Sequence, residues 1–197
     1  MKLKNLNLLL LISLTLFSCS NTKVKIASDD NYETVNFPDG SFAYLNKNSS
    51  IEFDENFAER RVKQKGEVFY EVQKGDNPFI VETEYGQVKV LGTKFNVKST
   101  NDNIEVEVES GSVEMKVDKL VKNIKKGQKA FVKETQKEIK LIKAELKHKQ
   151  WINNLKHEFK KLGKEIVKDS KDLKRESKKA GKSITKELKN LKKKVNN

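Results

Sequence analysis

Residues 88–97 have the sequence VKVLGTKFNV, and this stretch sets the class of fold. VKV at 88–90 alternates between apolar and charged residues, which is typical of a strand with one face in a core and one face in water. Gly92 interrupts the alternation, and a glycine inside a strand pattern marks a bulge or the close approach of another backbone. Asn96 lies between two apolar residues, so we expect its amide to bond to backbone inside the fold.

The same alternation recurs through the middle of the chain. Residues 104–109 have the sequence IEVEVE, and residues 113–117 have the sequence VEMKV. Turn-forming residues separate such runs at roughly 8–12 residue intervals, as at Pro38-Asp39-Gly40 and Ser110-Gly111. Short alternating strands at this spacing indicate an antiparallel sandwich or jelly roll. We therefore expect a mainly β domain over residues 31–141, with the glutamates of both runs on its solvated face.

Several segments of this region resemble the FecR domain family, in the order that the family shows. They are FPDGS at 37–41, GEVFYEV at 66–72, VLGTKFNV at 90–97, GSV at 111–113 and KGQ at 126–128. The resemblance covers about residues 30–135. It implies a FecR-like β domain whose signature residues determine turns and core and have no catalytic role. These residues are Pro38, Asp39, Gly40, Gly66, Glu67, Gly92, Thr93, Phe95, Asn96, Gly111 and Gly127.

Members of that family are usually regulators, and the resemblance implies a division of labour in them. A cytoplasmic domain holds a sigma factor, one helix crosses the inner membrane, and the periplasmic part senses a TonB-dependent receptor. This chain departs from the pattern at both ends, so we do not expect it to contact a sigma factor itself. We carry over the fold and an envelope role as an interaction, scaffold or sensing module. The alternative is an accessory regulator of FecR-type cell-surface signalling.

The sequence gives little support to catalysis. It contains one cysteine and two histidines, His148 and His157. The histidines are nine residues apart, which is not the i, i+4 spacing that places two ligands on one face of a helix. No Gly-rich phosphate loop is present, and no nucleophile has a candidate base. We expect no enzyme, no metal site and no cofactor. An enzyme would need polar residues gathered from different strands onto one face of the sandwich.

The N-terminus indicates export and lipidation. Two lysines precede an apolar stretch of 12 residues, Leu6–Phe17. A membrane-spanning helix needs about 20 apolar residues. The stretch is therefore typical of a signal peptide. Residues 16–19, LFSC, resemble the bacterial lipobox, which implies cleavage after residue 18 and a diacylglyceryl thioether on Cys19. We expect a lipid anchor in the outer membrane, facing the periplasm, with the periplasmic face of the inner membrane as the alternative.

Residues 142–197 have a different character from the rest of the chain. They hold 19 basic and seven acidic residues, and the remaining chain is nearly neutral. Segments 160–177 and 178–195 align without a gap and are identical at nine positions. Apolar residues recur about every 3.6 positions, so we expect an amphipathic helix. The repeated lysines predicted to bind an anionic surface are Lys160, Lys161, Lys164, Lys168, Lys171, Lys174, Lys178, Lys179, Lys182, Lys186, Lys189 and Lys192.

These features predict four segments. A signal peptide occupies residues 1–18, a linker 19–30, the FecR-like β domain 31–141, and a cationic helical tail 142–197. The expected partners are a membrane through Cys19, an anionic lipid or envelope polymer through the tail, and a periplasmic protein. Export removes the chain from most nucleic acid, so we do not expect the lysines to bind it. A solvated, partly disordered tail is the alternative to a surface-bound helix.

Overall fold

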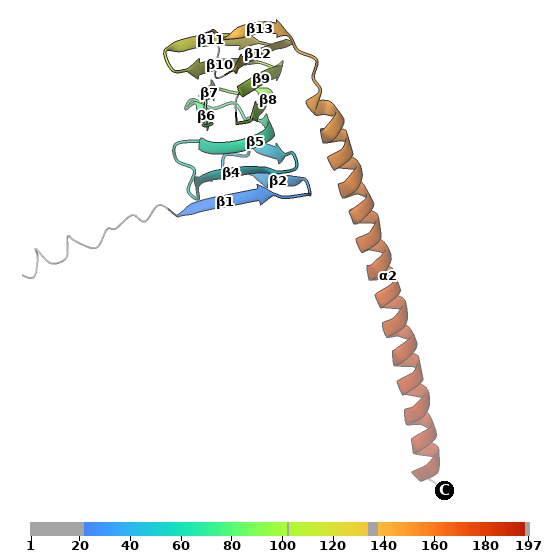
Figure 1. Ribbon diagram of the computed structural model, residues 1–197. Helices are drawn as coiled ribbons and strands as arrows, with labels where there is room; N and C mark the ends of the chain where they lie inside the picture. Colours follow the sequence, from blue (N-terminus) through green and yellow to red (C-terminus); the bar gives the residue numbers. More distant parts are fainter. Residues whose placement is uncertain (1–21, 102, 134–137, 196–197) are drawn as a thin grey trace, which may run out of the picture. The chain divides into compact units, whose positions relative to one another are not determined.

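The computed structural model describes residues 22–101, 103–133 and 138–195, and the side chains of α2 up to Lys179 together with Gly181. The predicted signal peptide and Cys19 lie outside the described residues. The chain divides into two compact units, Met1–His148 and Lys149–Asn197. We refer to the described part of the first, residues 22–148, as the β unit. Figure 1 shows its strands and the continuous helix α2.

The β unit contains every described strand. Their bounds are β1 Lys23–Ser28, β2 Glu33–Asn36, β3 Phe42–Leu45, β4 Ser49–Asp54, β5 Arg61–Glu71, β6 Phe79–Glu82, β7 Gln87–Val90, β8 Lys94–Ser99, β9 Asn103–Ser110, β10 Ser112–Val117, β11 Leu120–Lys125, β12 Gln128–Lys133 and β13 Lys140–Lys143. Helix α2 covers His148–Val195. The prediction of a mainly β fold followed by a long C-terminal helix is confirmed.

The strands form two sheets that share the long strand β5. The first sheet has the order β1-β4-β5-β6-β7-β10-β11, and the second has the order β2-β3-β5-β8-β9-β12-β13. Within β5, Arg61–Lys65 pair in the first sheet and Gly66–Glu71 pair in the second. Gly66 has φ +81°, and a Cβ there would lie 2.8 Å from Cα of Ser49. Glycine therefore permits the change of sheet inside β5.

One strand pair differs from the expected antiparallel arrangement. β6 runs parallel to the first part of β5, with Val62 opposite Val81. Because the second part of β5 belongs to the other sheet, the short connection after β5 can bring the chain back beside its beginning. The remaining pairs are antiparallel.

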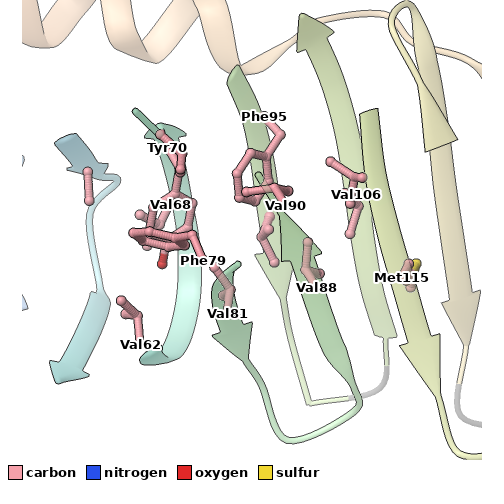
Figure 2. Close-up of a cluster of buried hydrophobic side chains, with 14 of the residues drawn as sticks. Val62, Val68, Tyr70, Phe79, Val81, Val88, Val90, Phe95, Val106 and Met115 are labelled. Carbon is pink, nitrogen blue, oxygen red and sulfur yellow. The ribbon is translucent and has the colours of Figure 1, made fainter. Parts of the chain in front are cut away.

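The core lies between the two sheets. Alternate residues of the strands point inward, and Phe79, Val81 and Val88 from the first sheet share one cluster with Tyr70 and Phe95 from the second. Figure 2 shows these side chains gathered on one side of their strands. At roughly 25 cal/mol per Å² of buried apolar surface, this cluster supplies the main favourable term for folding.

The end of the β unit differs from the predicted boundary at residue 142. Lys140–Lys143 form β13, which pairs with β12, and α2 begins only at His148. Pairing with β12 explains the difference, because a four-residue strand at the edge of a sheet has no strong local signal. The helix has 48 residues, so it is about 72 Å long at 1.5 Å per residue.

Candidate functional site

The predicted Pro38-Asp39-Gly40-Ser41 turn is tied to a buried arginine. Asp39 Oδ1 accepts a hydrogen bond from the Ser41 amide at 2.8 Å, and Oδ2 accepts one from Arg60 Nε at 2.7 Å. Arg60 Nη2 donates to the carbonyl of Gln73 at 2.8 Å. Both charged side chains are largely removed from water. Through Arg60, Asp39 therefore links the turn to the segment that follows β5. This role is structural.

A second group of signature residues meets on the outer face of the second sheet. Glu67 Oε2 accepts a hydrogen bond from Asn46 Nδ2 at 3.1 Å, and Glu67 Oε1 accepts one from Asn96 Nδ2 at 3.0 Å. The amide of Asn96 thus bonds to a side chain and not, as we expected, to backbone. The reason is the strand alternation, because Phe95 and Val97 point into the core and Asn96 points to the other face.

The remaining signature residues lie at turns and close contacts. A Cβ on Gly92 would lie 2.9 Å from Cα of Lys74, so the backbone of that segment needs a glycine beside it. Thr93 Oγ1 donates to the carbonyl of Ser112 at 3.0 Å. Phe95 is fully buried and stacks on Tyr70 with ring centroids 5.3 Å apart. Gly40, Gly111 and Gly127 adopt positive φ at turns.

A cluster that the sequence did not predict lies on the same face of the second sheet. The imidazole of His148 is fully buried, with Nδ1 3.1 Å from Glu107 Oε2 and Nε2 3.4 Å from Glu109 Oε2. Its ring stacks on Phe69 at 4.9 Å between centroids. The expectation that these glutamates are solvated is wrong for Glu107, which is only 5% exposed. Glu107 is buried in part by His148, which lies 41 residues later in the chain. No local sequence pattern indicates this contact.

The electrostatics of this cluster favour the ionised form of Glu107. Burial raises the pKa of its carboxyl, but the hydrogen bond from His148 and the charge of Lys129 lower it more. Lys129 Nζ lies 3.9 Å from Glu107 Oε1 and 2.5 Å from Glu105 Oε2. The net result is a pKa below the ordinary value for a glutamate.

A separate groove of about 930 Å³ crosses the outer face of the first sheet. The strand register places Lys25, Glu52, Lys63 and Glu82 in one row across β1, β4, β5 and β6. The turn at 83–86 and Lys116 also line it. Its lining carries four lysines and four acidic residues. Such a surface suits a polar partner with charges of both signs rather than an apolar small molecule.

The helix α2 presents its lysines to solvent as far as Lys179, where the description of its side chains ends. Of the predicted surface-binding lysines, Lys160, Lys161, Lys164, Lys168, Lys171, Lys174, Lys178 and Lys179 are exposed, and the side chains of the other four lie outside the described residues. Large apolar residues of the same helix are exposed too, namely Phe159, Leu162, Ile166, Val167 and Leu173. The helix continues without a break through both of its glycines.

Within the described part of the chain, no helix is long and apolar enough to cross a bilayer. Across residues 22–101, 103–133 and 138–195, no three histidine, cysteine or acidic side chains are grouped so that they could hold a metal ion.

Comparison with known proteins points to one family. The model of the family described as FecR protein matches residues 23–114. Two crystal structures of a candidate anti-sigma factor from Parabacteroides distasonis are similar, each with 29% sequence identity. The structure at 2.50 Å gives a TM-score of 0.59 and covers 62% of this chain and 60% of that one. The structure at 1.65 Å gives 0.62, with 66% and 64% covered.

The chain therefore spans less than two thirds of the length of these relatives. No curated protein matches it. The matched segment contains the Asp39–Arg60 pair and the Glu67 cluster, so the geometry and the family match concern the same strands. Residues 23–114 of this chain match the FecR protein family.

Proposed function

We propose that this chain is a non-catalytic regulatory module of FecR-type signalling, held at the cell envelope by a lipid on Cys19. The single observation that carries the proposal is the FecR match over residues 23–114. The similarity to a candidate anti-sigma factor supports it. The signature residues Asp39, Glu67 and Asn96 bond within the fold, which supports a domain that acts by binding rather than by chemistry.

The groove on the first sheet is the surface that best suits a protein partner. Its row of alternating charges can pair with a polypeptide that carries both signs, and such pairing contributes more to specificity than to affinity. Glu52 is paired with Lys23, and Glu82 is paired with Arg61. The acids of the row are therefore partly neutralised within the domain.

The lipid anchor and α2 would act together at a membrane. Several acyl chains hold a protein firmly, since each buried methylene contributes about 0.8 kcal/mol. Each lysine near an anionic lipid surface adds about 1 kcal/mol. The exposed apolar residues of α2, among them Leu162 and Ile166, give lipid a second kind of contact. Anchoring at Cys19 also raises the effective concentration of the helix at the bilayer.

The proposed function is tested by gene deletion followed by complementation. Deletion should change transcript levels of a sigma-factor regulon, and the wild-type gene should restore them. A Cys19→Ala gene should not restore them, and the protein should lose labelling by a palmitate analogue. Unchanged transcripts after deletion would contradict the regulatory role, and absence of label on the wild-type protein would contradict the anchor.

The groove is tested within the same strain. A triple variant Lys25→Gln, Lys65→Gln, Lys116→Gln removes three groove charges. A matched variant Lys119→Gln, Lys126→Gln, Lys133→Gln removes three exposed charges elsewhere on the β unit. Only the groove variant should fail to complement. Equal complementation by both variants would assign the partner surface elsewhere.

A second candidate function is an envelope scaffold without a part in signalling. The exposed lysines and apolar residues of α2 favour it, because they suit a lipid or polymer surface independently of the FecR domain. The deletion experiment separates the two functions. A scaffold predicts altered envelope integrity with unchanged sigma-dependent transcripts.

A further inference from the structure

The last residues of the β unit return to the outer face of the second sheet. After β13, the amide of Ala144 donates to the carbonyl of Gly127 at 2.8 Å. The next backbone N–H, that of Glu145, bonds to the carboxylate of Glu107. His148 then places its ring over Phe69, between Glu107 and Glu109. Residues 144–148 are thus held by backbone bonds and by one buried side chain.

The two ring nitrogens of His148 have the same kind of partner. Each lies opposite a carboxylate oxygen, Glu107 Oε2 for Nδ1 and Glu109 Oε2 for Nε2. An ionised carboxylate only accepts hydrogen bonds, and a neutral imidazole has a single N–H. A neutral ring would therefore direct one lone pair at a carboxylate inside a buried site. The doubly protonated ring satisfies both contacts.

The surrounding charges also favour a positively charged ring at His148. The outer face of β9 carries Glu105, Glu107 and Glu109, and β12 contributes Lys129 against the first two. Lys94 from β8 acts electrostatically on Glu109 and is paired with Glu71. In the connection to α2, Lys147 is paired with Glu145. Lys129 is thus the close lysine of Glu105 and Glu107, and an imidazolium at His148 supplies a further positive charge beside Glu107 and Glu109.

We propose that Glu107, Glu109 and His148 form a clasp that is closed while the imidazole carries both protons. The clasp opens when the ring loses one proton, and residues 144–148 leave the second sheet. Histidine is the side chain that ordinarily changes charge between about pH 5 and pH 8. Acidity near pH 5.5 keeps the clasp closed, and a rise towards pH 8.5 opens it. Because α2 begins at His148, opening frees the first residue of the helix from the sheet.

The clasp does not depend on the function proposed above. It can be tested on the full chain in detergent micelles by amide hydrogen exchange, read by mass spectrometry between pH 5.5 and pH 8.5. After correction for the intrinsic rate of exchange, protection of the Ala144 and Glu145 amides should fall by about tenfold or more across this range. Protection of Val97, in the centre of the second sheet, should stay constant.

Three variants make the test specific. His148→Gln removes the titrating ring, so protection at 144–145 should no longer depend on pH. Glu109→Gln offers an N–H to a neutral ring, so the pH dependence should shrink although His148 remains. His157→Gln changes an exposed histidine of α2 and should leave the pH dependence intact.

Constant protection of residues 144–145 in the wild type from pH 5.5 to pH 8.5 would overturn the proposal. A pH dependence that survives in His148→Gln would overturn it as well. If His148→Gln does not fold, Glu109→Gln decides the matter. Full pH dependence in that variant would show that a carboxylate opposite Nε2 is not needed.

Discussion

The two units of this molecule use similar apolar residues in opposite ways. In the β unit, Phe79 and Phe95 are fully buried. In α2, Phe159 is 44% exposed and Ile166 is 67% exposed. The β unit therefore buries most of its large apolar residues in its own core, whereas the middle of α2 leaves such residues exposed. A folded domain and a segment that needs a partner follow one another in the same chain.

The charged residues of the two units also differ in burial. In the β unit, Arg60 is 8% exposed and paired with Asp39, and Glu107 is buried against His148. In α2, Arg175 and Asp172 are mostly exposed and 3.9 Å apart. Buried pairs hold a fold in one geometry, whereas exposed pairs contribute little to stability. Equivalent substitutions in the two units should therefore have unequal effects.

The largest difference is expected for a pair of phenylalanines. Phe79→Ala should lower the free energy of unfolding by about 3–5 kcal/mol, because it opens a cavity in the core of the β unit. Phe159→Ala should change it by less than about 0.5 kcal/mol, because the ring is half exposed. Urea unfolding of both variants measures the two values. Similar losses would mean that α2 contributes to the same core.

A smaller difference is expected for a pair of arginines. Arg60→Gln should destabilise the β unit by about 2–3 kcal/mol, since Asp39 and the carbonyls of Gln73 and Asn77 lose a charged donor. Arg175→Gln in α2 should cost less than about 0.5 kcal/mol. Thermal unfolding followed by circular dichroism compares them. A negligible effect of Arg60→Gln would show that the Asp39 turn does not need its arginine.

The contrast between the units also sets an expectation for lipid binding. Phe159→Ser, Leu162→Ser and Ile166→Ser together should weaken binding of the full chain to anionic vesicles by about tenfold or more, because three apolar contacts are lost without a change in charge. Leu91→Ser with Val121→Ser, exposed in the β unit, should have little effect. Vesicle co-sedimentation measures both. Equal binding by the triple variant and the wild type would show that α2 binds vesicles through its positive charges alone.

Sequence patterns predicted the class of fold and the family because their signals are local. Alternation in residues 104–109 and the turn at Pro38-Asp39-Gly40 depend on near neighbours alone. The change of sheet within β5 and the parallel pair with β6 could not be predicted, because strand partners are set by distant contacts. β13 was missed for the same reason, since only its pairing with β12 makes it a strand.

The side-chain clusters could not be predicted for the same reason, because their members are distant in the sequence. Asn96 and Glu67 were both in the predicted signature, but their hydrogen bond joins residues 29 apart and reverses the expected partner of the amide. His148 was assigned to the tail by composition, because lysines surround it in the sequence. Its burial becomes evident only when β9 and β13 are placed in one sheet.

The smallest effect is expected for the acid end of the pH range, where the two units should again differ. Burial raises the pKa of Glu107, yet its bonds to His148 and Lys129 lower it below the ordinary value in the folded protein. A carboxyl with a lowered pKa stabilises the fold above its unfolded value of about 4.3, and this contribution is lost as the pH falls through the folded value. The wild type should therefore exceed Glu107→Gln in unfolding free energy by about 1 kcal/mol at pH 6, and the difference should shrink as the pH falls below the unfolded value. Asp172→Asn in α2 should change the unfolding free energy by less than about 0.5 kcal/mol, since its pair with Arg175 is exposed. Urea unfolding at stepwise pH measures all three proteins, and a gap for Glu107→Gln that widens towards acid would contradict the direction of the shift.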